Sequence, residues 1–156
     1  MHCKPKKQTM KNLFFLSLAI IVTLTSSAQF KGWETSVGAT VNASIAKNLN
    51  WNSKFWGQRV DFTKKNVNVS LGFMQNKAGN VQVPVLVGIE KGLNKKFNLG
   101  VRTGATFFNG QKGQFTYVPS ISYKVKDKWC VEQSVLRMVK DGKHSSQVGL
   151  AVRYHL

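Results

Sequence analysis

Apolar and polar residues alternate along most of the chain from Trp33 onward. Between Trp33 and Ile45 the odd positions carry mainly Val, Ala and Ile, and the even positions carry small polar residues. A period of two predicts a strand with one apolar and one polar face. The same pattern recurs in five more segments, which are Val67–Phe73, Val81–Ile89, Phe97–Phe107, Phe115–Val125 and Val148–Leu156.

Two further strands are predicted from a less regular pattern. One runs from about Leu49 to Phe62, with a bulge expected near Phe55–Trp56, and the other runs from Trp129 to about Val139. The segments between strands are short and rich in Lys, Asn, Gly and Asp, which is typical of turns. Eight strands with hairpin links and no helical period predict an all-β fold. We expect an antiparallel up-and-down sheet closed into an eight-stranded barrel.

The segment before the first strand has the layout of a secretory signal peptide. Lys11 precedes an apolar run from Leu13 to Leu24, and polar residues then lead to Ala28. The run is short for a helix that crosses a bilayer, which needs roughly twenty residues, although a membrane anchor is the alternative. We therefore expect a leader and signal peptide over residues 1–28, cleaved near Ala28, and a barrel domain over 29–156. Met10 is the more natural start than Met1.

Side-chain size on the polar rows indicates which face of each strand points inward. These rows carry mainly Gly, Ser, Thr, Asn and Ala, whereas the lysines gather in the connections. A strand surface in water would carry more Lys and Glu, and small residues suit the crowded interior of a narrow barrel. The sequence therefore predicts a transmembrane barrel whose aliphatic rows face hydrocarbon.

Charged residues also occur on the rows predicted to point inward. Opposite charges that pair inside the barrel would satisfy groups that cannot stay unpaired when buried. The alternative is that they are ordinary solvated strand charges. The predicted lumen charge network consists of Glu34, Arg59, Asp61, Glu90, Arg102, Lys124, Glu132 and Arg153.

Aromatic residues gather near both ends of the predicted strands. Two aromatic belts that flank an aliphatic band are typical of the two interfaces of a bilayer. The predicted belt at the end that carries the N-terminus consists of Trp33, Phe62, Phe97, Tyr123, Trp129 and Tyr154. The opposite belt consists of Trp56, Phe73, Phe107 and Phe115.

The segment from Gln29 to Leu156 resembles the small eight-stranded outer-membrane barrels of Gram-negative bacteria, the OmpX- and OmpA-like proteins. Its last strand, VGLAVRYHL, resembles the C-terminal insertion signal of such barrels, although the chain ends in Leu instead of an aromatic residue. The resemblance implies an outer-membrane location and recognition of this strand by the barrel-assembly machinery. We expect a monomer. The residues of the insertion row are Val148, Leu150, Val152, Tyr154 and Leu156.

Two prolines are at odds with a closed barrel. Proline removes a backbone donor, and a closed barrel has no edge strand to hold it. We expect Pro84 and Pro119 each to lie at a bulge or a strand end.

Residues with catalytic or metal-binding potential are few. His144 and His155 lack ligand spacing, so we expect no metal site and no cofactor. His144-Ser145-Ser146 has the His-x-Ser spacing of outer-membrane lipid A deacylases that resemble PagL, but Gln147 replaces their Asn and no acid follows Asp141. Catalysis needs a third group to orient the base, so no catalytic site is predicted.

The formal net charge of +17 raises the question of nucleic acid. The basic residues are spread over turns at both barrel ends, and export removes the chain from the cytoplasm, so no nucleic-acid partner is expected. The lysines either keep the rims soluble or contact phosphates of lipopolysaccharide or other anionic lipids.

The expected function is therefore a structural or interaction role in the cell envelope, without pore activity. One alternative is a soluble secreted or periplasmic barrel whose apolar rows face inward around an apolar ligand. A lipid A-modifying enzyme is the other.

Overall fold

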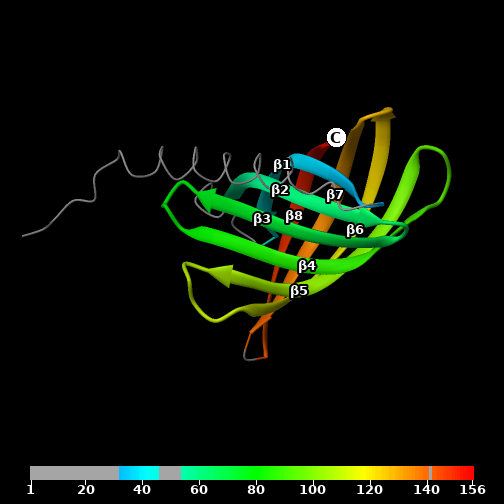
Figure 1. The fold of residues 1–156 in the computed structure, drawn as a ribbon. Coiled ribbons are helices and arrows are strands. Elements are labelled where there is room, and N and C mark those ends of the chain that lie inside the picture. Colours follow the sequence, from blue (N-terminus) through cyan, green and yellow to red (C-terminus); the bar gives the residue numbers. More distant parts are fainter. Residues whose placement is uncertain (1–31, 46–53, 141) are drawn as a thin grey trace, which may run out of the picture. The chain divides into compact units, whose positions relative to one another are not determined.

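The computed structural model describes residues 32–45, 54–140 and 142–156. The chain divides into two units, Met1–Gly32 and Trp33–Leu156, and the second holds all the described strands (Figure 1). The predicted signal peptide lies outside the described residues. The strands are β1 Glu34–Ser44, β2 Lys54–Lys64, β3 Val67–Asn76, β4 Val81–Gly92, β5 Phe97–Phe108, β6 Gln114–Lys126, β7 Trp129–Lys140 and β8 Lys143–His155.

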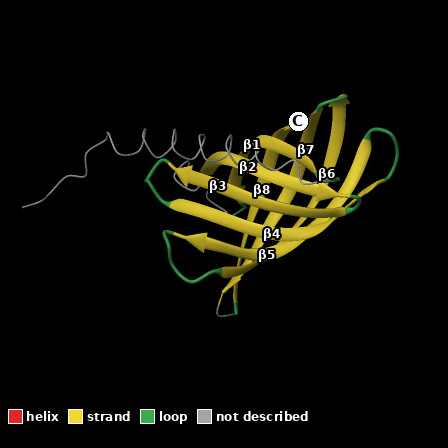
Figure 2. Cartoon of the chain, in the orientation of Figure 1, coloured by secondary structure: helices red, strands yellow, loops and turns green. Residues whose placement is uncertain are grey.

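The eight strands form one closed antiparallel barrel in chain order. Each strand pairs with its sequence neighbours, and β8 closes the barrel against β1 from Ser36↔His155 to Ser44↔Gln147. Among the described residues, short loops connect each strand from β2 to β7 with the next of these strands (Figure 2). The predicted all-β, eight-stranded up-and-down barrel is confirmed. Within the described segments, no helix has the length and apolar character that crossing a membrane requires.

The barrel has two ends that carry different connections. We call the termini end the one where β1 starts, β8 stops, and the β2–β3, β4–β5 and β6–β7 turns lie. The loop end carries the other four connections. Asparagine side chains shape turns at both ends: Asn94 Oδ1 accepts hydrogen bonds from the backbone of Lys96 and Phe97, and Asn76 Oδ1 accepts from Ala78 and Asn80. This is the turn chemistry that the sequence predicted.

The aliphatic rows point away from the lumen, as expected from side-chain size. The exposed fraction is 53% for Val101 and 56% for Leu150, whereas Arg102 is 3% exposed and Ala151 is 4% exposed. Neighbours in one strand thus alternate between the outer face and the barrel interior. The soluble alternative requires apolar rows that face inward, and the structure does not have that arrangement.

The two irregular strands are more regular than the sequence suggested. β2 keeps one register against β1 and β3 through Phe55 and Trp56, so the predicted bulge there is wrong. Its predicted start, residues 49–53, lies outside the described residues. β7 continues its alternation to its end, since Leu136 and Met138 are buried and Arg137 between them is exposed. The alternation was obscured because the inward residues are apolar there.

Neither proline lies at a bulge or a strand end, which corrects the prediction. The β3–β4 ladder passes from Leu71↔Val85 to Met74↔Gln82, and the two residue pairs between them, one of which contains Pro84, do not appear in the ladder. Pro84 keeps its place opposite Thr106 of β5. The β6–β7 ladder likewise passes over Pro119, which stays opposite Val101 of β5. The barrel therefore accommodates each proline by interrupting the ladder on one side without a change of register. The β6–β7 register shifts instead between Lys124 and Lys126.

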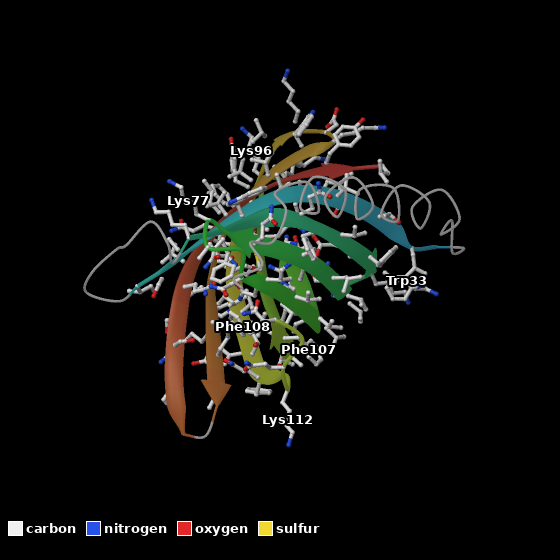
Figure 3. All side chains as sticks on the ribbon, turned by 90° about the vertical axis from the view of Figure 1, so that its left-hand side faces the viewer. Trp33, Lys77, Lys96, Phe107, Phe108 and Lys112 are labelled. Carbon is white, nitrogen blue, oxygen red and sulfur yellow. The ribbon has the colours of Figure 1, made fainter. Side chains whose placement is uncertain are left out.

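The lumen has two chemically different halves. Every buried charged side chain among the described residues lies toward the termini end, and we call this part the charged half. The uncharged half, toward the loop end, holds a hydrophobic cluster of Leu86, Val118, Leu136 and Met138, with Phe108 packed against it. Phe108 also meets Phe55 edge to face, with ring centroids 6.0 Å apart. Its neighbour Phe107 is on the outer face and 38% exposed (Figure 3).

Candidate functional site

Charged side chains from five strands meet inside the charged half and form one network. We call it the lumen cluster. Asp61 is fully buried, and Glu132 and Arg153 are each 1% exposed. Charges this deeply buried are tolerated only when they are paired and hydrogen-bonded. The members are Arg59 and Asp61 of β2, Glu90 of β4, Arg102 of β5, Glu132 of β7 and Arg153 of β8.

Glu132 lies at the centre of the cluster because it contacts all three arginines. Arg59 donates to it through both terminal nitrogens, at 2.8 and 2.9 Å, in the bidentate geometry that favours guanidinium–carboxylate pairs. Arg102 Nη2 pairs with Oε1, and Arg153 Nη2 lies 3.2 Å from Oε2. Without this carboxylate, three guanidinium groups would share two acids.

Asp61 connects the same arginines from the β2 wall. Arg59 Nε donates to Oδ2 at 2.9 Å, and the nearest nitrogens of Arg102 and Arg153 lie 3.6 and 3.7 Å from its oxygens. The hydroxyl of Ser70, on β3, contacts Asp61 Oδ1 as well. Asp61 therefore has a partner for each oxygen although it has no contact with solvent.

Glu90 extends the cluster toward the termini end. Arg153 Nη2 donates to Oε1 at 3.2 Å, and Nη1 donates to Oε2 at 3.3 Å. Asn98 Nδ2 and the Ser122 hydroxyl each donate to Oε1 at 3.1 Å. Ser122 brings β6 into the network, so the contacts described here join polar side chains from all strands between β2 and β8.

Glycines make room for the arginines. A Cβ at Gly38 of β1 would lie 3.0 Å from Arg153 Cγ and 2.8 Å from Val152 O. A Cβ at Gly88 of β4 would clash with the Val101 carbonyl and lie 2.6 Å from Arg102 Cα. The strands can approach closely at these points because the inward position has no side chain.

The lumen cluster is balanced in charge and fills its part of the barrel. Its three arginines face three carboxylates, so the formal net charge of +17 of the chain lies outside it. Two of its buried donors, Arg102 Nε and Arg153 Nε, have no hydrogen-bond partner. All three guanidinium groups and all three carboxylates are otherwise engaged with one another, so the cluster is suited to closing the lumen and binding strands together.

The structure brings together six of the eight residues predicted for this network and leaves two outside. Glu34 is the first residue of β1 and is exposed. Lys124 is on an inward row but near the rim, and its amine pairs with Asp127 of the next turn at 3.7 Å. Both lie at strand ends, where water reaches the side chain. Alternation assigns a face, but it does not say how deep a position lies.

The uncharged half contains amides and hydroxyls between its apolar side chains. Gln82 is fully buried, its Nε2 lies 3.7 Å from Met138 Sδ, and its Oε1 has no partner. The Thr116 hydroxyl donates to Thr106 Oγ1 at 2.8 Å. This half is held mainly by packing and a few neutral hydrogen bonds.

The predicted aromatic residues lie at the two ends of the outer face. At the termini end, Phe97 packs against Tyr123 with centroids 4.9 Å apart, and Trp129 packs against Tyr154 at 5.0 Å. Trp33 lies just before β1, and Phe62 lies near the end of β2, close to the β2–β3 turn. At the loop end, Trp56, Phe107 and Phe115 are exposed, and Phe73 is partly buried.

The C-terminal strand presents its predicted row on the outer face. Val148, Leu150 and Val152 are 40%, 56% and 42% exposed, and Leu156 is 61% exposed. The inward neighbour Arg153 belongs to the lumen cluster. β8 therefore carries an apolar outer row and a charged inner residue at once.

The catalytic alternative gains no support from the geometry. His144 and Ser146 lie two residues apart on one face of β8, and no carboxylate in the described segments contacts His144. The same part of the chain holds no group of three or more His, Cys, Asp or Glu residues arranged for a metal ion. Cys130 is buried with a free thiol, and Arg153 Nη2 lies 3.7 Å from its sulfur.

Sequence reasoning missed the uncharged members of the site. Ser70, Ser122 and Asn98 complete the hydrogen bonds of the carboxylates, and Gly38 and Gly88 open space for the arginines. All five lie on the inward rows next to charged positions. Their position on the inward rows was the one signal in the sequence that could have identified them. Ser, Asn and Gly are common on every inward row, so these five residues do not stand out.

No protein-family model and no curated protein matches the chain. Solved structures do match. A de novo designed transmembrane β-barrel has a TM-score of 0.66 at 12% identity, covering 82% of this chain and 98% of the design. The N-terminal β-barrel domain of Pseudomonas aeruginosa OprF has a TM-score of 0.64 at 11% identity, covering 79% and 97%. Ail, the attachment invasion locus protein of Yersinia pestis, has a TM-score of 0.58 at 14% identity, covering 80% of this chain and 97% of Ail. The chain thus has the fold of small outer-membrane β-barrels.

Proposed function

We propose that this protein is an integral outer-membrane barrel with a structural or interaction role in the cell envelope. The observation that carries the proposal is the band of exposed aliphatic side chains around the barrel. Val41, Val87, Leu99 and Val101 are each between 46% and 53% exposed on the outer face. Contiguous apolar surface of this kind is rare on soluble monomers, and it suits lipid chains.

The interior supports the same proposal. A membrane barrel turns the usual arrangement inside out, because hydrocarbon surrounds it and polar groups must find partners within. Here the buried arginines and carboxylates satisfy one another in the lumen cluster. The aromatic pairs Phe97–Tyr123 and Trp129–Tyr154 lie at one end of the aliphatic band, as interfacial belts do.

The proposed role does not include diffusion through the lumen. An eight-stranded barrel is just wide enough for side chains to fill it. Glu132 and its three arginines join β2, β5, β7 and β8 across the interior. A solute would have to displace paired charges to pass.

The expected partners are lipids at the two rims and the assembly machinery at β8. Exposed lysines occur at both ends of the barrel and suit the phosphates of lipopolysaccharide or other anionic lipids. The outer row of β8 suits recognition during insertion. We expect a monomer that binds no nucleic acid, exported by a signal peptide cleaved near Ala28.

The substitution Val101→Arg tests the membrane assignment. An arginine at the bilayer midplane destabilises a barrel by about 2–4 kcal/mol, whereas an exposed position in water tolerates it. We expect Val101→Arg to lower the urea midpoint of the protein refolded in lipid vesicles, with Lys77→Arg at an exposed turn as the control. The wild type should fractionate with membranes and show heat-modifiable gel migration. A chain that stays folded and soluble without detergent, and that tolerates Val101→Arg, would contradict the proposal.

A further inference from the structure

Lysines are grouped at three separate turns around the termini end. They occupy the β2–β3, β4–β5 and β6–β7 turns and the strand residues next to them, and all are exposed. They are Lys64 and Lys65, then Lys91, Lys95 and Lys96, then Lys124, Lys126 and Lys128. We call them the termini-end lysine ring. Lys96, which belongs to this ring, and Lys77 and Lys112 of the loop end lie at the periphery of the molecule in Figure 3.

Few acids are near this ring. Glu90 belongs to the lumen cluster through Arg153, and Asp127 pairs with Lys124 at 3.7 Å. Asp61 and Glu132 are buried inside the balanced lumen cluster, and Glu34 is exposed at the start of β1. The internal balance of the lumen cluster leaves the ring as a local excess of positive charge.

Two lysines of the ring are held against the aromatic belt. Lys64 Nζ lies 5.9 Å from the centroid of an aromatic ring of Trp33. Lys128 Nζ lies 5.6 Å from the centroid of the Tyr154 aromatic ring. Tyrosine and tryptophan rings settle at the height of lipid headgroups, with their apolar part toward the chains. The ammonium groups are thereby placed at the level of the headgroup phosphates.

We propose that the termini-end lysine ring binds the phosphates of anionic glycerophospholipids in the adjoining leaflet. The proposal rests on the membrane location proposed above and names the lipid that this end selects. The three lysine groups are exposed at three different turns around the rim of the barrel. A partner docked against one side of the rim would reach only some of these turns, whereas headgroups surround a membrane barrel on every side. Each lysine near an anionic surface increases the affinity roughly fivefold.

The experiment uses the mature chain refolded in nanodiscs of phosphatidylcholine with a minor fraction of spin-labelled phosphatidylglycerol. The measured quantity is the association constant of phosphatidylglycerol relative to phosphatidylcholine. The test variant is the double substitution Lys65→Gln with Lys95→Gln. The matched control is Lys77→Gln with Lys112→Gln, which removes two lysines that are also exposed, from turns at the loop end. None of these four lysines forms an ion pair with a described carboxylate or a cation–π contact with a described ring.

We expect the wild type to prefer phosphatidylglycerol, and the preference to fall about 25-fold in the test variant, which loses two lysines, and less than twofold in the control. Added inorganic phosphate at millimolar concentration should leave the preference intact, since the site takes the lipid and not the free anion. Loss of preference in added phosphate, equal losses in the two variants, or no preference in the wild type would each overturn the inference. Heat-modifiable migration of the same samples separates this outcome from failure of the proposed function, because a barrel can insert and still lack lipid preference.

Discussion

The two halves of the lumen solve the same problem with different chemistry. The charged half fills its space with arginines and carboxylates that bridge β2, β4, β5, β7 and β8, while the uncharged half packs Leu86, Val118, Leu136 and Met138 around a few neutral hydrogen bonds. Paired buried charges are weak contributors to net stability, but removing one partner is severe. An apolar cluster loses stability more evenly, in proportion to the volume removed. The halves should therefore respond differently to single substitutions.

The largest effect is expected from Glu132→Gln. The substitution keeps the size of the side chain but leaves three guanidinium groups with two carboxylates, and such an uncompensated buried charge destabilises by about 3–5 kcal/mol. The measurement is the free energy of unfolding in urea, followed by tryptophan fluorescence in lipid vesicles. Glu34→Gln is the matched control, because Glu34 is exposed and should change stability by less than about 0.5 kcal/mol. Equally small effects of Glu132→Gln and Glu34→Gln would contradict the interpretation that the charges of the lumen cluster depend on one another.

A cavity in the uncharged half should have a smaller effect. Leu136 is 4% exposed within the apolar cluster, so Leu136→Ala should destabilise the barrel by about 2–3 kcal/mol. Leu150→Ala on the outer face removes the same atoms from a position that lipid can refill. The same urea titration should therefore give less than half the loss for Leu150→Ala, and a reversed order would contradict the assignment of the two faces.

The close packing of Gly88 against Arg102 can be tested next. Gly88→Ala would place a methyl group against the backbone of β5 and the stem of Arg102, and overpacking of this kind destabilises by about 1–3 kcal/mol. Gly92→Ala, four residues further along the chain, meets nothing closer than 3.4 Å and should be nearly neutral. Thermal unfolding of both variants in detergent compares the sites, and equal midpoints would contradict close packing at Gly88.

The smallest effect should be a gain. Gln82 is fully buried and its Oε1 has no partner, so Gln82→Met replaces an unsatisfied amide by an apolar side chain of similar size. We expect stability to be unchanged or to rise by about 1 kcal/mol. The companion change, Arg59→Met in the charged half, should destabilise strongly in the same urea assay. A loss of more than about 1 kcal/mol for Gln82→Met would mean that this half also depends on polar contacts.

The fold could be predicted from the sequence because alternation, turn residues and strand count report on local structure. Val81–Ile89 and Phe97–Phe107 alternate so regularly that both the strands and their outer faces follow directly. The part of β7 near the loop end was harder to predict, because Leu136 and Met138 point inward and are apolar. A period-two pattern fails where both faces of a strand are hydrophobic.

The charged site could be predicted only in part, because alternation gives the face of a residue and not its depth or its partners. Arg59, Asp61 and Glu132 share the inward face with Lys124, yet only the first three reach the cluster. Depth follows from the register of eight strands, which no single segment contains. The prolines show the same limit, since the ladder interruptions beside Pro84 and Pro119 depend on how two neighbouring strands tolerate a missing donor.

The position of Arg153 on β8, the strand that closes the barrel, ties charge neutrality in the lumen to barrel closure. Arg153 reaches Glu90 across 63 residues of sequence, and it also contacts Asp61 and Glu132. A polypeptide that ends before β8 would hold three acids against two arginines, with an open wall beside β1. Such a fragment would have to bury a surplus negative charge in order to assemble. A fragment without β8 should therefore not form a stable barrel. β8 supplies both the strand that pairs with β1 and the third arginine of the lumen cluster.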